Sequence, residues 1–217
     1  MGLKRRFPKQ VFAACGYHPE QDPPTNEERD GLISWILVHR AEIAAIGEVG
    51  LPYYKRQEAE EQGLSFDLAP YLDLLERFIV LSKEMNKPLV LHAVYEDADL
   101  ACDLLHKYGV SKAHFHWFKG NAQTIQRMIS AGYYISITPD VLYEEEIQSL
   151  ASIYPLELMM VETDGPWPFE GPFAGKETLP IMIMDVIEQI AYIKQLSVEK
   201  TAAKLLSNTR QFYGVDI

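Results

Sequence analysis

Cysteine and long apolar runs are both scarce in this sequence. Its 217 residues contain two cysteines, Cys15 and Cys102, which form neither a C-x-x-C pair nor a zinc-ribbon spacing. This usage is typical of reduced structural thiols. No apolar stretch approaches the ~20 residues that a membrane helix needs, and the basic start "MGLKRRFPKQ" lacks the apolar core of a secretory signal. These absences predict a cytoplasmic protein with no membrane partner.

Basic residues are fewer than acidic residues. The sequence has 20 Lys and Arg residues against 31 Asp and Glu residues, a formal net charge of −11. Proteins that bind nucleic acid over a broad surface carry a basic footprint, so the charge balance argues against extended electrostatic binding but not against a local site. A Walker loop, a Rossmann fingerprint and a nucleophile elbow are missing as well. None of these chemistries therefore competes for the motifs described below.

Short apolar runs alternate with helical patterns along the chain. Near-continuous apolar runs suit strands buried on both faces, as in parallel sheets covered by helices. Six such runs occur, at residues 11–19, 44–51, 88–94, 112–118, 132–139 and 156–164. Helical patterns lie between and after them, at residues 25–43, 66–86, 96–109, 121–132, 143–154, 177–194 and 197–213. No linker or repeat interrupts the alternation, which predicts one α/β domain over residues 1–217.

Side chains able to bind a metal gather at one end of the apolar runs. They are His18, Glu48, His92, His116 and Asp164, each at or close to the C-terminal end of a predicted strand. In a β/α barrel these ends share one face, so the side chains would surround one pocket. Imidazoles and carboxylates together suit Zn²⁺, Mn²⁺ or Fe²⁺ better than Ca²⁺. Such ions lower the pKa of bound water towards ~7, which predicts a hydrolase.

Each of these residues taken singly has a structural alternative, and two pairs need a choice between neighbours. A lone histidine at a strand end is usually a hydrogen-bonded structural residue. His114 and His116 share one face by the strand period of two, as do Glu162 and Asp164. We interpret His116 and Asp164 as the ligands. His114 and Glu162 are then expected beside the site, with Glu162 supporting a ligating Asp164.

The strand-end motifs resemble those of a known family. The segments "CGYHPE", "AIGEVGLPYY", "KPLVLHA", "HFHWFKG", "GYYISITP" and "MMVETDGPW" occur in this order and are similar to those of TatD-type metal-dependent deoxyribonucleases of the amidohydrolase superfamily. The resemblance implies a TIM-type β/α barrel, divalent Mg, Mn or Zn, and hydrolysis of DNA phosphodiesters. By motif, Glu48 would bridge two metals, and His92 and His116 would bind one of them. Asp164 would bind the other or act as the base, and His18 would line the substrate pocket.

The chain departs from the family pattern at its start. Family members begin with a strand that ends in a His-x-His pair, followed by a further strand-helix unit, and this sequence shows neither. We therefore predict an N-terminally truncated barrel of about six of the eight units, either a shortened product or a divergent member with an open barrel. The metal site that shares Glu48 with His92 and His116 is expected to persist, with the second site weak or empty. Exposed sheet edges would favour a homo-oligomer.

Three functions remain open from the sequence. The leading hypothesis is a metal-dependent hydrolase that cleaves DNA, with Asp164 and Glu48 as its catalytic residues. The second is hydrolysis of a small ester, lactone or amide, which the acidic net charge favours. The third is a barrel remnant without catalysis that acts as a binding or assembly module.

Overall fold

Six strands form the sheet in the computed structural model, which describes residues 1–216. They are β1 (Ala13–Cys15), β2 (Ile43–Gly50), β3 (Leu89–His92), β4 (Ala113–Phe115), β5 (Tyr134–Ile137) and β6 (Met159–Val161). The strands are hydrogen-bonded neighbours in the order of the sequence, and the pairs β1/β2, β2/β3 and β5/β6 are parallel. Each predicted apolar run overlaps one of these strands, which confirms the α/β class.

Helices connect and follow the strands. The α-helices are α1 (Gly2–Arg6), α2 (Asn26–Val38), α3 (Tyr53–Glu61), α4 (Ala69–Met85), α5 (Glu96–Tyr108), α6 (Ala122–Ala131), α7 (Glu145–Ile153), α8 (Ile183–Lys194) and α9 (Val198–Tyr213). Short 3₁₀ turns lie at η1 (Pro139–Leu142), η2 (Leu156–Leu158), η3 (Gly171–Phe173) and η4 (Pro180–Met182). Among residues 1–216, none of the helices combines the length and apolar character needed to cross a bilayer.

Local capping explains where several helices begin and end. The Thr25 hydroxyl accepts from the Glu28 backbone N–H while the Glu28 carboxylate accepts from the Thr25 N–H, a complete capping box for α2. The Asn121 side chain caps α6 by accepting the backbone N–H groups of Gln123 and Thr124. Gly109 and Gly132 end α5 and α6 in the left-handed conformation that favours glycine. These four helix ends match the sequence patterns because each of these caps depends only on residues close by in the chain.

The bounds of several predicted elements were wrong, and one helix was missed. The helix predicted over residues 25–43 ends at Val38, and the one predicted over residues 177–194 begins as α8 only at Ile183. The predicted strands were too long: β3, for example, ends at His92, although Ala93 and Val94 remain buried beyond it. An apolar run marks burial, and burial here continues past the last strand residue into the loop. The helix α3 was not predicted, because Pro52 precedes it without a side-chain cap.

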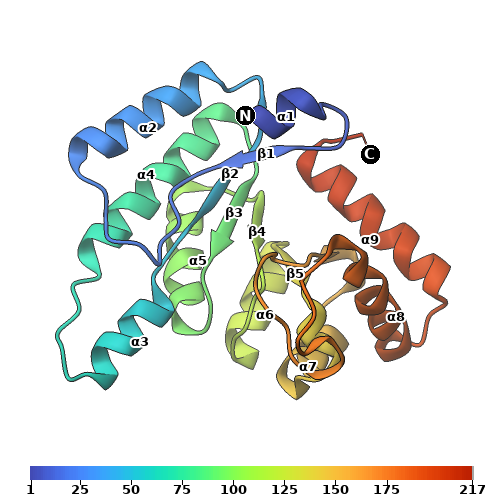
Figure 1. Cartoon of the computed structure of the whole chain (residues 1–217). Coiled ribbons are helices and arrows are strands. Elements are labelled where there is room, and N and C mark those ends of the chain that lie inside the picture. Colours follow the sequence, from blue (N-terminus) through green and yellow to red (C-terminus); the bar gives the residue numbers. More distant parts are fainter. Residues whose placement is uncertain (217) are drawn as a thin grey trace. The chain divides into compact units, whose positions relative to one another are not determined.

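The chain divides into two compact units, residues 1–114 with the end of the chain from Tyr213, and residues 115–212. In the first unit, β2 is the longest strand and lies between β1 and β3. The helix α4 packs against β2 and α5, and Figure 1 shows it alongside the strands. Ile46, Phe78 and Leu89 are fully buried there. This packing holds the C-terminal ends of β2 and β3 in place.

The second unit is built around β5, β6 and the helices α6 to α8. The helix α8 packs against α7, η1 and β6. A small apolar cluster follows β6 in the chain, in which Phe169, Phe173 and Met182 are buried and Trp117 and Leu142 pack against them. The loop that begins at Asp164 is therefore anchored by its own aromatic side chains.

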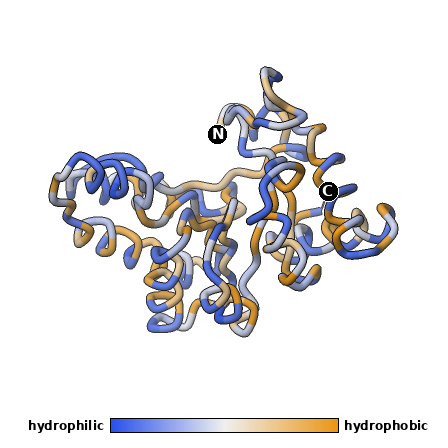
Figure 2. Tube along the Cα trace, turned by 90° about the horizontal axis from the view of Figure 1, so that it is seen from below, coloured by the Kyte–Doolittle hydropathy of each residue, from blue (hydrophilic) through white to orange (hydrophobic). Residues whose placement is uncertain are grey.

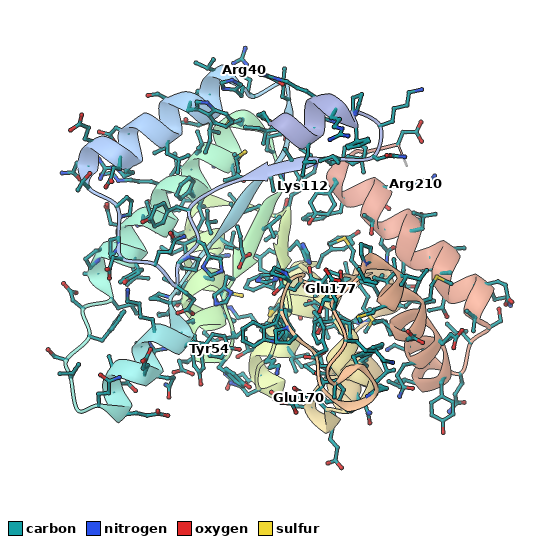
Figure 3. All side chains as sticks on the ribbon, in the orientation of Figure 1. Arg40, Tyr54, Lys112, Glu170, Glu177 and Arg210 are labelled. Atoms are coloured by element: carbon teal, nitrogen blue, oxygen red, sulfur yellow. The ribbon has the colours of Figure 1, made fainter. Side chains whose placement is uncertain are left out.

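Side-chain polarity follows burial in both units. Helical turns alternate between hydrophilic and hydrophobic residues in Figure 2, as expected where one helix face is buried. Charged residues such as Arg40 and Glu170 are exposed, and Tyr54 at the start of α3 is half exposed (Figure 3).

Candidate metal centre

Close contact between β2 and β3 positions the first two candidate ligands, Glu48 and His92. Gly50 pairs with His92 across the strands, and a Cβ atom on Gly50 would lie only 1.8 Å from the His92 carbonyl oxygen. A Cβ on Gly47 would lie 2.6 Å from the Val90 Cβ. The absence of a side chain at Gly47 and Gly50 therefore permits the two strands to approach closely. This approach places Glu48 beside His92.

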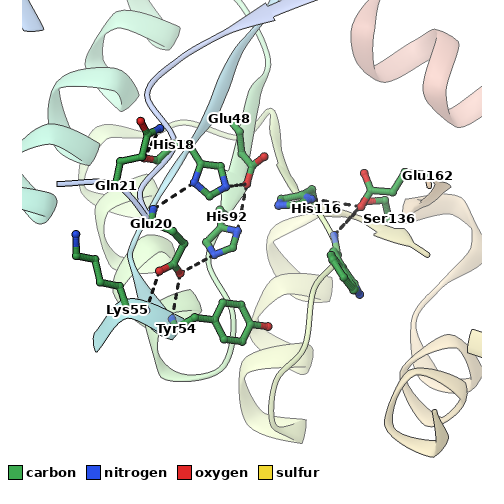
Figure 4. A network of polar contacts seen from close by, with 11 residues as sticks. His18, Glu20, Gln21, Glu48, Tyr54, Lys55, His92, His116, Ser136 and Glu162 are labelled. Atoms are coloured by element: carbon green, nitrogen blue, oxygen red, sulfur yellow. Dashed lines mark hydrogen bonds and ion pairs between the residues drawn. The ribbon is translucent and has the colours of Figure 1, made fainter. Parts of the chain in front are cut away.

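Three side chains of the first unit meet at this point, as Figure 4 shows. The Glu48 Oε1 atom lies 3.3 Å from His18 Nε2 and 3.1 Å from His92 Nδ1. All three candidate ligand atoms lie within 4.8 Å of one another. Atoms that bind one ion at about 2.0–2.2 Å lie roughly 3 Å apart, so two imidazoles and a carboxylate with this spacing fit a divalent transition metal. The geometry thus brings together Glu48, His92 and His18.

Glu20 is a member of this cluster that the sequence interpretation missed. Its Oε1 atom lies 3.1 Å from His92 Nε2, on the opposite side of the ring from Glu48. The same carboxylate accepts the backbone N–H groups of Tyr54 at 3.0 Å and Lys55 at 2.8 Å. Burial favours the neutral acid, but these hydrogen bonds outweigh it and hold the pKa of Glu20 below its ordinary value. The available signal was an acid two residues after His18, in the segment "YHPEQD".

A second group of predicted residues lies in the second unit. His116 is buried, and its Nδ1 atom lies 3.4 Å from Glu162 Oε1. The same Glu162 oxygen accepts the Trp117 backbone N–H at 2.8 Å. A carboxylate at one imidazole nitrogen leaves the other nitrogen for a ligand. Glu162 therefore contacts His116, and its predicted support of Asp164 stays a prediction.

Asp164 lies three residues beyond the end of β6, at the start of the turn that leads to Trp167. Its φ angle is +30°, in the left-handed region that non-glycine residues rarely adopt. Such conformations gather at functional sites, where the surrounding structure maintains them. The backbone at Asp164 is thus consistent with a functional position, and its ligand or base role stays a prediction.

His114 makes a different contact from His116. Its side chain is buried, and its Nδ1 atom lies 2.7 Å from the Tyr213 hydroxyl oxygen, at the end of α9. His114 lies within β4 and His116 directly follows it, two residues apart as the strand period requires. His114, however, contacts Tyr213 near the C-terminal end of the chain. Its predicted place beside the site stays a prediction.

The predicted ligand set is distributed over both units. Glu48 and His92 belong to the first unit with His18 and Glu20, while His116, Glu162 and Asp164 belong to the second. Each group is supported within its own unit by the contacts described above.

An ion pair beside the first group gives a prediction for stability. Arg56 Nη2 lies 2.7 Å from Asp97 Oδ1, and the Asp97 side chain is fully buried. Burial raises the pKa of Asp97 from 3.8 to about 6, against the opposing effect of Arg56. The folded protein then binds more protons than the unfolded chain between about pH 4 and pH 6, so this carboxyl lowers stability as the pH rises through that window.

The variant Asp97→Asn removes this titration. We expect it to lose more stability relative to wild type at about pH 4 than at about pH 7, by at most about 3 kcal/mol. Urea unfolding of both proteins at the two pH values measures the difference. An equal loss at both values would contradict the assignment of a raised pKa to Asp97.

Comparisons with known proteins agree with this geometry. The profile of the family described as TatD related DNase matches residues 1–214. A Haemophilus influenzae protein named as an uncharacterized metal-dependent hydrolase is 39% identical over 213 residues, 98% of this chain and 82% of that protein. A human protein named deoxyribonuclease TATDN3 is 28% identical over 225 residues, 98% of this chain and 78% of that protein.

The solved structures show the same fold. The TatD homologue YJJV of Escherichia coli K12 superposes with a TM-score of 0.78 at 23% identity, covering 100% of this chain and 83% of that one. A TatD family hydrolase of Entamoeba histolytica gives a TM-score of 0.79 at 20% identity, covering 98% of this chain and 79% of that one. This likeness confirms the predicted α/β fold class of TIM type. With the match over residues 1–214, the chain belongs to the TatD related DNase family of metal-dependent hydrolases.

Proposed function

We propose that this protein hydrolyses DNA phosphodiester bonds with a divalent metal ion held at Glu48 and His92. The observation that carries the proposal is the 3.1 Å separation of His92 Nδ1 and Glu48 Oε1 in a member of the TatD related DNase family. The name of the human relative supports DNA as the substrate class. His116 and Asp164 complete the proposed ligand set by their motifs, and a second metal is not needed for the proposal.

The proposed site residues have separate roles in binding the metal, contacting the substrate and orienting water. Glu48 and His92 would hold the cation, which supplies polarisation of a phosphoryl oxygen and a lowered pKa for water. His18 lies on the open side of the cluster, with 41% of its side chain exposed, where it can reach substrate. Asp164 is proposed as the base that orients the attacking water and accepts its proton.

DNA cleavage is expected to depend on metal and on Asp164. Chelator should abolish cleavage of an end-labelled single-stranded oligonucleotide, and added Mn²⁺ or Mg²⁺ should restore it. The variant Asp164→Asn should lower the rate by about 10²- to 10⁴-fold, the usual contribution of a general base. The matched control is Asp185→Asn, which removes an exposed acid from the first turn of α8 and should leave the rate unchanged.

Two results would contradict this proposal. Cleavage that is indifferent to chelator would exclude the metal-dependent mechanism. Intact DNA together with turnover of a small ester, lactone or amide would favour the second candidate, which the net charge of −11 supports because phosphate polyanions are repelled at long range. Neither cleavage nor turnover by metal-loaded protein would favour a binding or assembly module.

We also propose that the protein is cytoplasmic and forms a homo-oligomer. Cys15 and Cys102 are free thiols, which is ordinary in a reducing compartment. Within residues 1–216, β1 and β6 are the end strands of the sheet order. End strands present backbone groups that can pair with another chain, so the predicted homo-oligomer would form there.

A further inference from the structure

Two histidines of the first unit present one ring nitrogen each to the same carboxylate oxygen. His18 Nε2 and His92 Nδ1 both face Glu48 Oε1, and distance alone makes both of them candidate ligands. A neutral imidazole carries a proton on one nitrogen and a lone pair on the other. Only the nitrogen with the lone pair can bind a metal, so the partner of the second nitrogen decides which histidine is a ligand.

Glu20 contacts the second nitrogen of both rings. Its ionised carboxylate can only accept, so His92 Nε2 at 3.1 Å must donate its proton to Glu20. In the neutral ring, which is the form that binds a metal, the lone pair of His92 then lies on Nδ1, facing Glu48. The backbone N–H of Glu20 donates to His18 Nδ1 at 3.2 Å, so the lone pair of His18 is occupied and, in the neutral ring, its proton lies on Nε2. The nitrogen of His18 that lies 3.3 Å from Glu48 Oε1 is therefore the protonated one.

This arrangement leaves a lone pair of His92 opposite a carboxylate oxygen of Glu48. Two acceptors 3.1 Å apart repel each other unless a cation lies between them. His18 presents a protonated nitrogen to the same oxygen, at 3.3 Å, and a protonated nitrogen cannot bind a cation. The cation site thus belongs to His92 and Glu48.

We propose that Glu20 is a positioning residue that selects His92 as the metal ligand and keeps the proton of His18 on Nε2, which excludes this nitrogen as a ligand. Its carboxylate acts on His92 and its backbone N–H acts on His18. The carboxylate is itself held by the first turn of α3, through the backbone N–H groups of Tyr54 and Lys55. The inference rests on the proposed metal site, and its test includes a measurement on metal-free protein.

The variant Glu20→Ala separates the two actions, because it removes the carboxylate and keeps the backbone N–H. Nitrogen-15 NMR of metal-free protein at about pH 9, well above the ordinary histidine pKa, reports the tautomer of each ring. In wild type, both rings should carry the proton on Nε2. In Glu20→Ala, His92 should become a mixture of tautomers while His18 stays unchanged. An unchanged His92 tautomer would overturn the proposal.

Calorimetric titration with Mn²⁺ gives the second readout. The dissociation constant should rise by about 10- to 100-fold in Glu20→Ala, as for other groups that orient a metal ligand. The matched control is Asp22→Asn, which removes an acid of the same loop that contacts the Lys55 side chain at 2.5 Å. It should leave both the tautomers and the dissociation constant unchanged. A similar loss of affinity in Asp22→Asn would mean that loop charge, not orientation of His92, sets the affinity.

The variant Glu20→Gln distinguishes orientation from loosening of α3. Its amide oxygen can still accept from His92, but its amide N–H₂ group cannot accept from the helix. We expect a lowered melting temperature with Mn²⁺ affinity between that of wild type and Glu20→Ala. Equal losses of affinity in both variants would overturn the proposal. A wild-type protein that binds no metal would refute the proposed function instead, and the tautomers would still test the role of Glu20.

Discussion

The variant His92→Ala is expected to bind no metal under conditions in which the wild-type protein binds about one equivalent of Mn²⁺ or Zn²⁺. His92 presents the nitrogen nearest to Glu48 Oε1 in the first unit, at 3.1 Å. Residues that only orient a ligand change metal affinity by about 10- to 100-fold, so removal of a ligand should exceed 100-fold. Elemental analysis after dialysis measures the bound metal.

Thermal unfolding supplies an independent measurement for His92→Ala. Metal at about 100 times its dissociation constant stabilises a folded protein by about 2.7 kcal/mol. Chelator should therefore lower the melting temperature of wild type and leave that of His92→Ala unchanged. The control is His106→Ala, because His106 is an exposed histidine in the last turn of α5. Full metal content in His92→Ala would remove His92 from the ligand set.

The variant Gly50→Ala is expected to damage both stability and activity without touching a candidate ligand. The added Cβ would lie 1.8 Å from the His92 carbonyl oxygen, a backbone atom that cannot move without displacing β3. Overpacking of this kind costs about 3 kcal/mol or more where the contact is with backbone. A shift of about 1 Å at the site can reduce the rate by about 100-fold.

Denaturant unfolding and a DNA cleavage assay together test the Gly50 prediction. Gly31→Ala is the matched control, since Gly31 lies within α2 and a Cβ there would meet no atom within 4 Å. That variant should be as stable as wild type or more stable by about 0.5–1 kcal/mol, because alanine suits a helix better than glycine. If Gly50→Ala were as well tolerated, β2 and β3 would not approach as closely as the structure shows.

Much of the fold was readable from local patterns. Each of the six apolar runs overlaps a strand, and the caps at Thr25, Asn121, Gly109 and Gly132 lie at bounds of the helical patterns over residues 25–43, 96–109 and 121–132. These features depend on side chains within a few residues of one another, or on burial that imposes an apolar run.

Neither the helix α3 nor the contact of Glu162 with His116 could be predicted from local sequence patterns. The cap of α3 comes from the Glu20 carboxylate, 34 residues earlier than Tyr54 in the chain, and no local pattern connects the two segments. Glu162 contacts His116, 46 positions away by number, and the strand period indicated only that Glu162 shares a face with Asp164. Contacts between distant segments depend on how the strands pair, which a pattern of single residues does not encode.

The sequence established which chemical groups are present and near which strand ends they lie: imidazoles at 18, 92 and 116 and carboxylates at 48, 162 and 164. It predicted these residues as the site of a hydrolase, because imidazoles and carboxylates together at strand ends suit a divalent metal. It did not show how the histidines differ. His18 and His92 both face Glu48, and what separates them is the partner of the second ring nitrogen, a backbone N–H for one and a carboxylate for the other. That difference exists only once folding has brought Glu20 between the two rings, because the position of an imidazole proton is set by its neighbours in space.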